Sequence, residues 1–86
     1  MYDVRYTSKA IRQLRKLDRH TQLLLKAWIE RNLIGCINPR QLGKALTGNR
    51  SGQWRYRVGD YRILADIQDD VVIVLVLEVG HRKNIY

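Results

Sequence analysis

Cysteine and histidine are scarce in this chain of 86 residues. The one cysteine, Cys36, cannot form an intramolecular disulfide, which fits a reducing cytoplasm. Cys36 stands among apolar neighbours, where a small buried side chain is a better interpretation than a nucleophile. The two histidines, His20 and His81, are far apart in sequence, and no CxxC pair is present. A zinc site is therefore not expected.

Nucleotide-binding loops and clusters of metal-binding acids are also missing. No glycine-rich phosphate loop occurs, which leaves nucleotide-dependent enzymes unsupported. A two-metal nuclease needs a cluster of acids, and the acids in the second half of the chain are few and scattered. They are Asp60, Asp66, Asp69, Asp70 and Glu78. We therefore expect a protein without a metal site or a cofactor.

Long apolar runs and a leader sequence are absent as well. The longest apolar run, Val71–Leu77, is far too short to span a membrane. The first residues, Met1–Arg5, show no basic region followed by an apolar run, so no signal peptide is expected. The length suits a single domain over residues 1–86. We expect a cytoplasmic protein with no membrane partner.

Positive charge is present in excess. Sixteen lysines and arginines oppose eight aspartates and glutamates, for a net charge of +8, and eleven of the sixteen are arginine. The planar fork of arginine suits phosphate better than the point charge of lysine does. This excess favours a polyanionic partner such as RNA, DNA or an acidic protein. The alternative is a surface that is merely basic, and the patterning of the charge argues against it.

Apolar periodicity predicts helices and strands in an order typical of an α+β domain. Strands are expected at residues 2–6, 54–58, 61–67 and 71–79. Two helices follow the first strand, one capped at Thr7–Ser8 and one closed by Gly35, and they form a helical hairpin. A short third helix is expected from Asn38–Pro39 to Gly48. The helices should pack on one face of a small, mostly antiparallel, twisted sheet.

The pattern also assigns faces to these elements. The apolar side chains of the second helix should point inward: Leu23, Leu24, Ala27, Trp28 and Leu33 or Ile34. A row of basic residues on the first helix is interpreted as a solvated face: Lys9, Arg12, Arg15, Lys16 and Arg19. The last strand is apolar at every position of Val71–Leu77, which is typical of a strand covered on both faces near the middle of a sheet.

Residues 53–62, Gln-Trp-Arg-Tyr-Arg-Val-Gly-Asp-Tyr-Arg, predict a β-hairpin with an unusual charge distribution. Gly59–Asp60 suits a type II′ turn, which places Arg57 opposite Arg62 and Arg55 opposite Leu64. Arginines facing one another repel, so we expect an anion to lie between them. The arginines should lie on the open face of the sheet. Facing the helices, we expect the bulky row Trp54, Tyr56, Tyr61 and Ile63.

Arginine, histidine and tyrosine together suit metal-free cleavage of RNA by its own 2′-hydroxyl. That reaction needs a base, a cation at the phosphate and an acid for the departing 5′ oxygen. The phosphate should be held by Arg55, Arg57, Arg62 and Arg82. Histidine titrates near neutral pH, which makes His81 the candidate for proton transfer, with capping of backbone groups at a strand end as the alternative. Tyr86 donates a proton or stacks on a base. Further RNA contacts are expected from Arg50, Lys44 and Lys83.

These stretches resemble the RelE/ParE superfamily of bacterial toxins over nearly the whole chain. The resemblance rests on Leu42–Leu46 followed by Gly48, on Trp54–Leu64 and on Val79–Tyr86. The Gly-x-Tyr-Arg turn and the terminal Gly-His-Arg-x-x-x-Tyr are similar to the RelE branch. The resemblance implies a RelE-like fold and a ribosome-dependent endoribonuclease that cuts mRNA. It also implies three partners: ribosomal RNA, mRNA and a cognate antitoxin.

The resemblance implies roles for individual residues. Arg55 and Arg57 fall where the best-known RelE carries two catalytic lysines, and Arg62 matches its phosphate-stabilising arginine. Arg82 matches an arginine assigned to leaving-group protonation or charge stabilisation. Tyr86 corresponds to a tyrosine that orients or stacks on the substrate, although its spacing from Arg82 is shorter here. Because arginine does not give up its proton in a protein, proton transfer falls to His81, as in related toxins with a terminal histidine.

Two other functions are compatible with parts of the pattern. A ParE-like toxin poisons DNA gyrase without cleaving RNA, and that branch is expected to lack the full basic, histidine and tyrosine set. A plain RNA- or DNA-binding module would show salt-dependent binding and no cleavage product. The presence of the full set favours the endoribonuclease.

Overall fold

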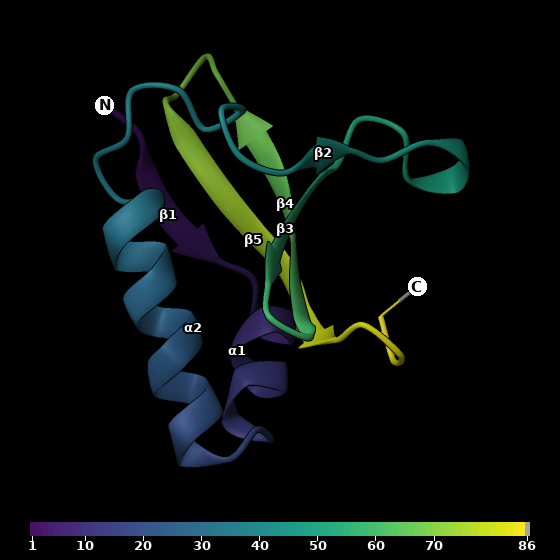
Figure 1. The fold of residues 1–86 in the computed structure, drawn as a ribbon. Helices are drawn as coiled ribbons and strands as arrows, with labels where there is room; N and C mark the ends of the chain where they lie inside the picture. The colour runs from purple at the N-terminus through teal and green to yellow at the C-terminus, as the bar shows by residue number, and fades with distance from the viewer. Residues whose placement is uncertain (86) are drawn as a thin grey trace.

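The structure, a computed structural model, describes residues 1–85 and contains two helices and a five-stranded sheet. In chain order the elements are β1 (Asp3–Tyr6), α1 (Ser8–Arg15), α2 (Arg19–Asn32), β2 (Lys44–Ala45), the 3-10 turn η1 (Gly48–Arg50), β3 (Trp54–Val58), β4 (Tyr61–Gln68) and β5 (Ile73–His81). Figure 1 shows α1 and α2 side by side against the sheet. The expected α+β class, with helices on one side of a mostly antiparallel sheet, is confirmed.

The strands follow the order β1-β5-β4-β3-β2, with β1 parallel to β5 and every other pair antiparallel. The apolar strand β5 thus lies inside the sheet, as its composition predicts. It begins at Ile73 rather than Val71, which corrects the expected boundary. Val71 is 54% exposed, and Val72 has a φ of 57°, a left-handed conformation that belongs to a turn.

Beyond the end of β1, side chains of Thr7 and of α1 form hydrogen bonds with the backbone of β5. Pairing with β1 ends at Val76, and the Thr7 hydroxyl then donates to the carbonyl of Leu77 at 2.9 Å. The same hydroxyl oxygen caps α1 by accepting from the N–H of Ala10 at 3.1 Å. The N–H of Val79 donates to Oε1 of Gln13 at 2.8 Å. These contacts fix the part of β5 that leads to His81.

The buried stripe of α2 differs from the expected one. Thr21, Leu25 and Ile29 are buried at a spacing of four, followed by Leu33. Four residues that were expected to point inward are instead exposed: Leu23 (54%), Leu24 (48%), Ala27 and Ile34 (50%). Asp18 sets the phase because its side chain accepts from the N–H of Thr21 and anchors the first turn. Three consecutive leucines at 23–25 leave that phase ambiguous in the sequence.

The third helix expected over residues 39–48 is wrong. This segment makes turns and bends over residues 39–43 and then pairs as β2 with β3, with Lys44 opposite Arg55. Its carbonyls are taken by β3 side chains, since Trp54 Nε1 donates to Leu42 at 2.7 Å and the Tyr56 hydroxyl donates to Pro39 at 2.5 Å. Gly43 has a φ of +84° and lies so close to β3 that a Cβ there would collide with the Arg55 carbonyl. Tertiary contacts therefore override the local helix signal.

The β3–β4 hairpin has the expected register. Arg57 lies opposite Arg62 and Arg55 opposite Leu64. Gly59 has a φ of +60° and Asp60 does not have a positive φ, as a type II′ turn requires. Tyr56 and Ile63 are fully buried against the helices, with Trp54 and Tyr61 packed beside them. Neither α1 nor α2 is long and apolar enough to cross a membrane, and these are the helices within residues 1–85.

Candidate active site

The sheet face opposite the helices carries two rows of residues that run across β3, β4 and β5. One row is Arg55–Leu64–Glu78 and the other is Arg57–Arg62–Gly80. Residues directly opposite one another on neighbouring strands project from the same face, so three arginines share it. We call this surface, defined by these two rows, the arginine face.

The arginines of this face differ in burial. Arg57 is exposed, Arg55 and Arg62 are half-buried, and Leu64 between the rows is fully buried. A half-buried guanidinium interacts more strongly with an anion than an exposed one, because less water screens the charge. This arrangement can attract an anion, and phosphate is an anion that accepts forked hydrogen bonds from arginine.

The chain after β5 folds back over the same face. A turn closes where the N–H of Asn84 donates to the carbonyl of His81 at 2.8 Å. Ile85 is then only 3% exposed and lies over Gly80, since a Cβ built on Gly80 would be 3.9 Å from Ile85. Gly80 is opposite Arg62, so the tail covers one end of the arginine row. Tyr86 lies outside the described residues.

His81 belongs to the other side of the sheet. It is opposite Tyr61, and its ring meets the Tyr61 ring edge-on at a centroid distance of 5.4 Å. Its Nδ1 accepts from the N–H of Lys83 at 3.1 Å, which is the backbone-capping role considered as an alternative. A neutral ring that accepts at Nδ1 carries its proton on Nε2. The structure thus sets His81 at the end of β5 and does not group its ring with the arginine rows.

Arg82 lies at the turn of the hairpin. Its N–H donates to the carbonyl of Asp60 at 2.8 Å, and its Nε is 4.0 Å from Asp60 Oδ1. The side chain is 57% exposed, so this ion pair is weak and leaves the guanidinium available to a stronger anion. Lys44, opposite Arg55, adds charge at the β2 side, while Lys83 is exposed on the tail.

Glu78 is a member of this face that the sequence pattern did not single out. Arg50 Nη1 contacts it at 2.7 Å and Lys9 Nζ at 3.3 Å. Burial raises the pKa of the Glu78 carboxyl, but hydrogen bonds from Arg50 and Lys9 outweigh it and hold that pKa below its usual range. Arg50, expected to contact RNA, is therefore engaged with a carboxylate. The register of β5, two residues before Gly80, is the signal that would have placed Glu78 here.

Two hollows adjoin Arg55, and Lys44 also lines both of them. The first, of about 430 Å³, lies between Arg55 and the segment 44–50. The second, of about 450 Å³, also reaches Arg57 and α2. Within residues 1–85, no three His, Cys, Asp or Glu side chains are grouped so that they could hold a metal ion.

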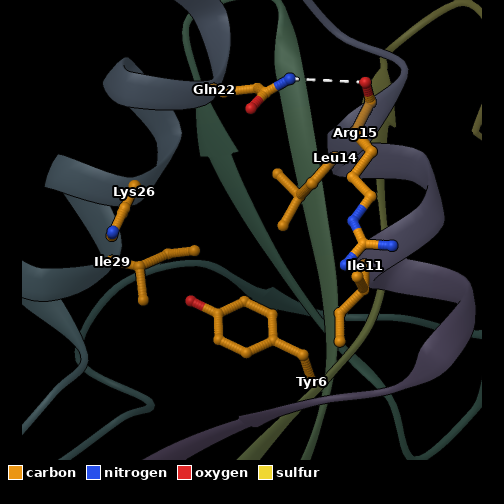
Figure 2. A pocket seen from close by; sticks show the side chains of 7 residues that line it. All are labelled: Tyr6, Ile11, Leu14, Arg15, Gln22, Lys26 and Ile29. Carbon is orange, nitrogen blue, oxygen red and sulfur yellow. Dashed lines mark hydrogen bonds between the residues drawn. The ribbon is translucent and has the colours of Figure 1, made fainter. Parts of the chain in front are cut away.

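A third hollow, of about 260 Å³, is apolar and lies between α1 and α2. Figure 2 shows Tyr6 beneath it, with Ile11 and Leu14 from α1 on one side and Ile29 from α2 on the other. Arg15 and Lys26 border it. Because the helices cover the opposite face of the sheet, this groove is separate from the arginine face. Its lining offers packing surface rather than a reactive group.

Comparisons with known proteins agree with this architecture. The family described as the ParE toxin of the type II toxin–antitoxin system, parDE, matches residues 4–86. Toxin RelG of Mycobacterium tuberculosis is 37% identical over 87 residues, which cover 99% of this chain and 95% of that protein.

Solved structures give the same result. A chain of the toxin–antitoxin complex RelBE2 from Mycobacterium tuberculosis superposes with a TM-score of 0.86 at 32% identity, over 96% of this chain and 93% of that one. The isolated RelE toxin of E. coli shares the fold, with a TM-score of 0.72 at 20% identity over 94% of this chain and 84% of that one. With the family match and these relatives, the chain belongs to the RelE/ParE superfamily of toxins from type II toxin–antitoxin systems.

Proposed function

We propose that this toxin is a ribosome-dependent endoribonuclease of the cytoplasm, which cleaves mRNA without a metal ion. The ribosome would present the codon, and the 2′-hydroxyl of the RNA would lose its proton to solvent water and attack the adjoining phosphate, while the bond from phosphorus to the 5′ oxygen breaks. The observation that carries the proposal is the Arg57–Arg62 pair beside Arg55 on an open sheet face. Like charges set opposite one another cost stability, and an anion between them removes that cost. A scissile phosphate is such an anion.

The arginines hold the phosphate and stabilise the charge that develops on it. Arg57 and Arg62 bind it from neighbouring strands, and Arg55 and Arg82 bind the RNA on either side. None of these arginines serves as a base, since a guanidinium stays protonated. Donors placed where charge develops contribute about 10²–10³-fold in rate each. Lys44 and Lys83 would supply contacts to flanking phosphates, and Arg50 would join them by exchanging Glu78 for a phosphate.

His81 is proposed as the proton donor to the departing 5′ oxygen. It is the last residue of β5, and this role requires its ring to leave Tyr61 and turn toward the arginine face. A doubly protonated ring cannot accept from the N–H of Lys83, so loading His81 with a second proton removes one of the two hydrogen bonds of the turn that follows it. Tyr86, the next candidate, would orient the substrate or stack on a base.

Cleavage on the ribosome tests this proposal. Purified toxin is incubated with ribosomes carrying a defined mRNA, and the 5′ ends of the products are mapped. The parent should cut within the codon of the decoding site, and Arg62→Ala, Arg82→Ala and His81→Ala should cut at least about 100-fold more slowly. Intact mRNA at saturating parent toxin would refute it.

A gyrase inhibitor of the ParE kind is the second candidate, because the matching family model carries the ParE description. Arg82→Ala separates the two functions. Growth inhibition should disappear in this variant if the toxin is a nuclease. Growth inhibition that persists, together with inhibited supercoiling by purified gyrase, would assign the chain to the second function.

The proposed regulator is an antitoxin with an acidic, amphipathic segment that folds on contact. The RelBE2 relative is a toxin–antitoxin complex, and the net charge of +8 suits an acidic partner. We propose that this segment covers or displaces the tail around Arg82 to Tyr86. The NMR signals of Ile85, which covers Gly80 in the free chain, should shift on binding. Unchanged tail signals in a complex that leaves the arginines exposed would count against it.

A further inference from the structure

The hollow at the outer edge of β3 has the lining of a nucleobase site. It lies between α2 and the segment 42–44, with a volume of about 450 Å³. Trp28 and Asn32 line it from α2, and Lys44, Arg55 and Arg57 line it from the sheet. Pairing of β2 with β3 stops at Arg55, so no strand within residues 1–85 covers the edge of β3 beyond that point.

The chemistry of this lining matches single-stranded RNA. Three cations border the hollow, and none of the acidic side chains within residues 1–85 lines it. Proteins that bind unpaired nucleotides stack bases on aromatic rings and hold phosphates with arginine and lysine. Trp28 is half-buried and backed by Tyr56, with ring centroids 5.5 Å apart and a tilt of 53°. Its ring is therefore held in place by the core.

Asn32 supplies a hydrogen-bonding edge next to that ring. It follows Trp28 by one helical turn, which puts both on the same face of α2. Its Nδ2 donates to the Trp28 carbonyl at 3.0 Å, which fixes the orientation of the amide. Oδ1 accepts from none of the donors within residues 1–85 and is turned away from that carbonyl. The amide can therefore accept at Oδ1 and donate its second N–H.

The opposite wall is rigid before any ligand binds. Trp54 Nε1 holds the Leu42 carbonyl at 2.7 Å, and the Tyr56 hydroxyl holds Pro39 at 2.5 Å. Burial raises the pKa of Tyr56, so its hydroxyl stays protonated and remains a donor. A preformed wall lowers the ordering cost of binding.

We infer that this hollow binds the base of a nucleotide that adjoins the phosphate on the arginine face. Arg55 and Arg57 line both surfaces, so the RNA can pass from one to the other without a gap. The Oδ1 acceptor and the second N–H of Asn32 can pair with an adjoining donor and acceptor on the edge of a base, such as the amino group and ring nitrogen of adenine or the N3–H and carbonyl of uracil. Stacking on Trp28 favours the larger adenine. The role in cleavage rests on the proposed function, whereas the binding does not.

The two tryptophans, Trp28 and Trp54, give a direct readout, because their indole N–H groups are the only ones in the chain. The chain is titrated with tetranucleotides of adenosine or uridine that carry 2′-O-methyl groups and cannot be cleaved. The Trp28 signal should shift with the adenosine probe, and the uridine probe should bind about tenfold more weakly. Equal binding of both probes, RNA binding without a Trp28 shift, or no binding at all overturns the inference.

Matched variants separate the base site from general charge. Trp28→Leu should weaken binding of the adenosine probe about tenfold and remove its preference over uridine, Trp28→Phe should restore most of both, and Asn32→Ala should weaken binding of both probes. Leu23→Ala, on the exposed side of α2 away from the hollow, should bind like the parent. Circular dichroism checks the fold of each variant, and Asn32→Ala keeps the test decisive where Trp28→Leu fails to fold.

The ribosome assay keeps this inference apart from the proposed function. A Trp28 shift in a toxin that leaves ribosomal mRNA intact supports the base site and refutes the nuclease. Cleavage by the parent toxin with a Trp28 signal that stays unchanged on RNA binding supports the nuclease and refutes the base site. A Trp28 signal that moves with an acidic antitoxin peptide but not with RNA assigns the hollow to the protein partner, which also refutes the base site.

Discussion

Removing Arg57 should stabilise the fold and destroy the activity at the same time. Arg57 is exposed and faces Arg62 across β3 and β4, and no side-chain hydrogen bond or ion pair holds it within residues 1–85. Like charges directly opposite in a sheet lower the free energy of unfolding by a few tenths to about 1 kcal/mol. Arg57→Thr removes that repulsion and supplies a good strand former.

The expected gain is about 0.5 kcal/mol, which corresponds to a rise in Tm of roughly 2–4 °C for a domain of this size. Thermal unfolding followed by circular dichroism at low salt measures it, and the gain should shrink at high salt, where the repulsion in the parent is screened. Loss of one donor at the phosphate should slow ribosomal cleavage by about 10²–10³-fold.

Arg5→Thr is the matched control. Arg5 is also an exposed arginine in a strand, but it faces Leu75 and is paired with Asp3 at 3.1 Å. Its replacement relieves no repulsion and should leave cleavage unchanged. A lower Tm in Arg57→Thr, or cleavage at the parent rate, would refute the reasoning that the facing arginines are kept for an anion.

Three further predictions follow. His81→Gln and His81→Ala should both slow cleavage by about 10²–10⁴-fold, because glutamine can accept the hydrogen bond from the N–H of Lys83 but cannot give a proton to the 5′ oxygen. Activity retained in His81→Gln alone would show that His81 acts only as a hydrogen-bond acceptor. Gly43→Ala should lower the free energy of unfolding by about 2–4 kcal/mol, measured in urea, since it combines a left-handed backbone with a collision against β3. Hydrogen bonds from Arg40 and then Tyr2 lower the pKa of Asp69 to about 2, so its contribution is complete above its unfolded pKa of about 3.9 and is lost as the pH falls toward 2. Asp69→Asn should flatten the stability curve over that interval, and an unchanged acid limb would contradict this.

The hairpin could be predicted from the sequence because its determinants are local. Gly59 sets the turn, the alternation of arginine with aromatic residues sets the faces, and the pairing of Arg57 with Arg62 follows from both. The interior place of β5 follows from its apolar composition. The part of the candidate site that lies on the hairpin can therefore be predicted from the sequence.

The parts that could not be predicted depend on distant contacts. The segment 39–48 is not helical because Trp54 and Tyr56 bind its carbonyls, and no local sequence signal predicts these contacts. The phase of α2 is hidden by three consecutive leucines. The hollow beside Trp28 exists only because α2 and the segment 42–44 meet at the edge of β3.

The side of the sheet on which His81 lies follows from the alternation of residues along β5. Val79 is buried against the helices, and alternation by two puts His81 on the same side as Val79, away from Arg62. The prediction that His81 joins the arginines rested on its position next to Arg82 in the sequence, and neighbouring residues of a strand point to opposite faces. The tail that returns Ile85 over Gly80 needs a turn at 81–84, which the sequence does not specify.

Mapping mRNA ends on the ribosome tests the central claim most directly. Parent toxin, Arg57→Thr, Arg62→Ala and the Arg5→Thr control are compared on the same programmed ribosomes. We predict cuts within the decoding-site codon for the parent and the control, and a cleavage rate at least about 100-fold lower for the two variants of the arginine face. Intact mRNA with the parent, or equal cleavage by all four proteins, would contradict it.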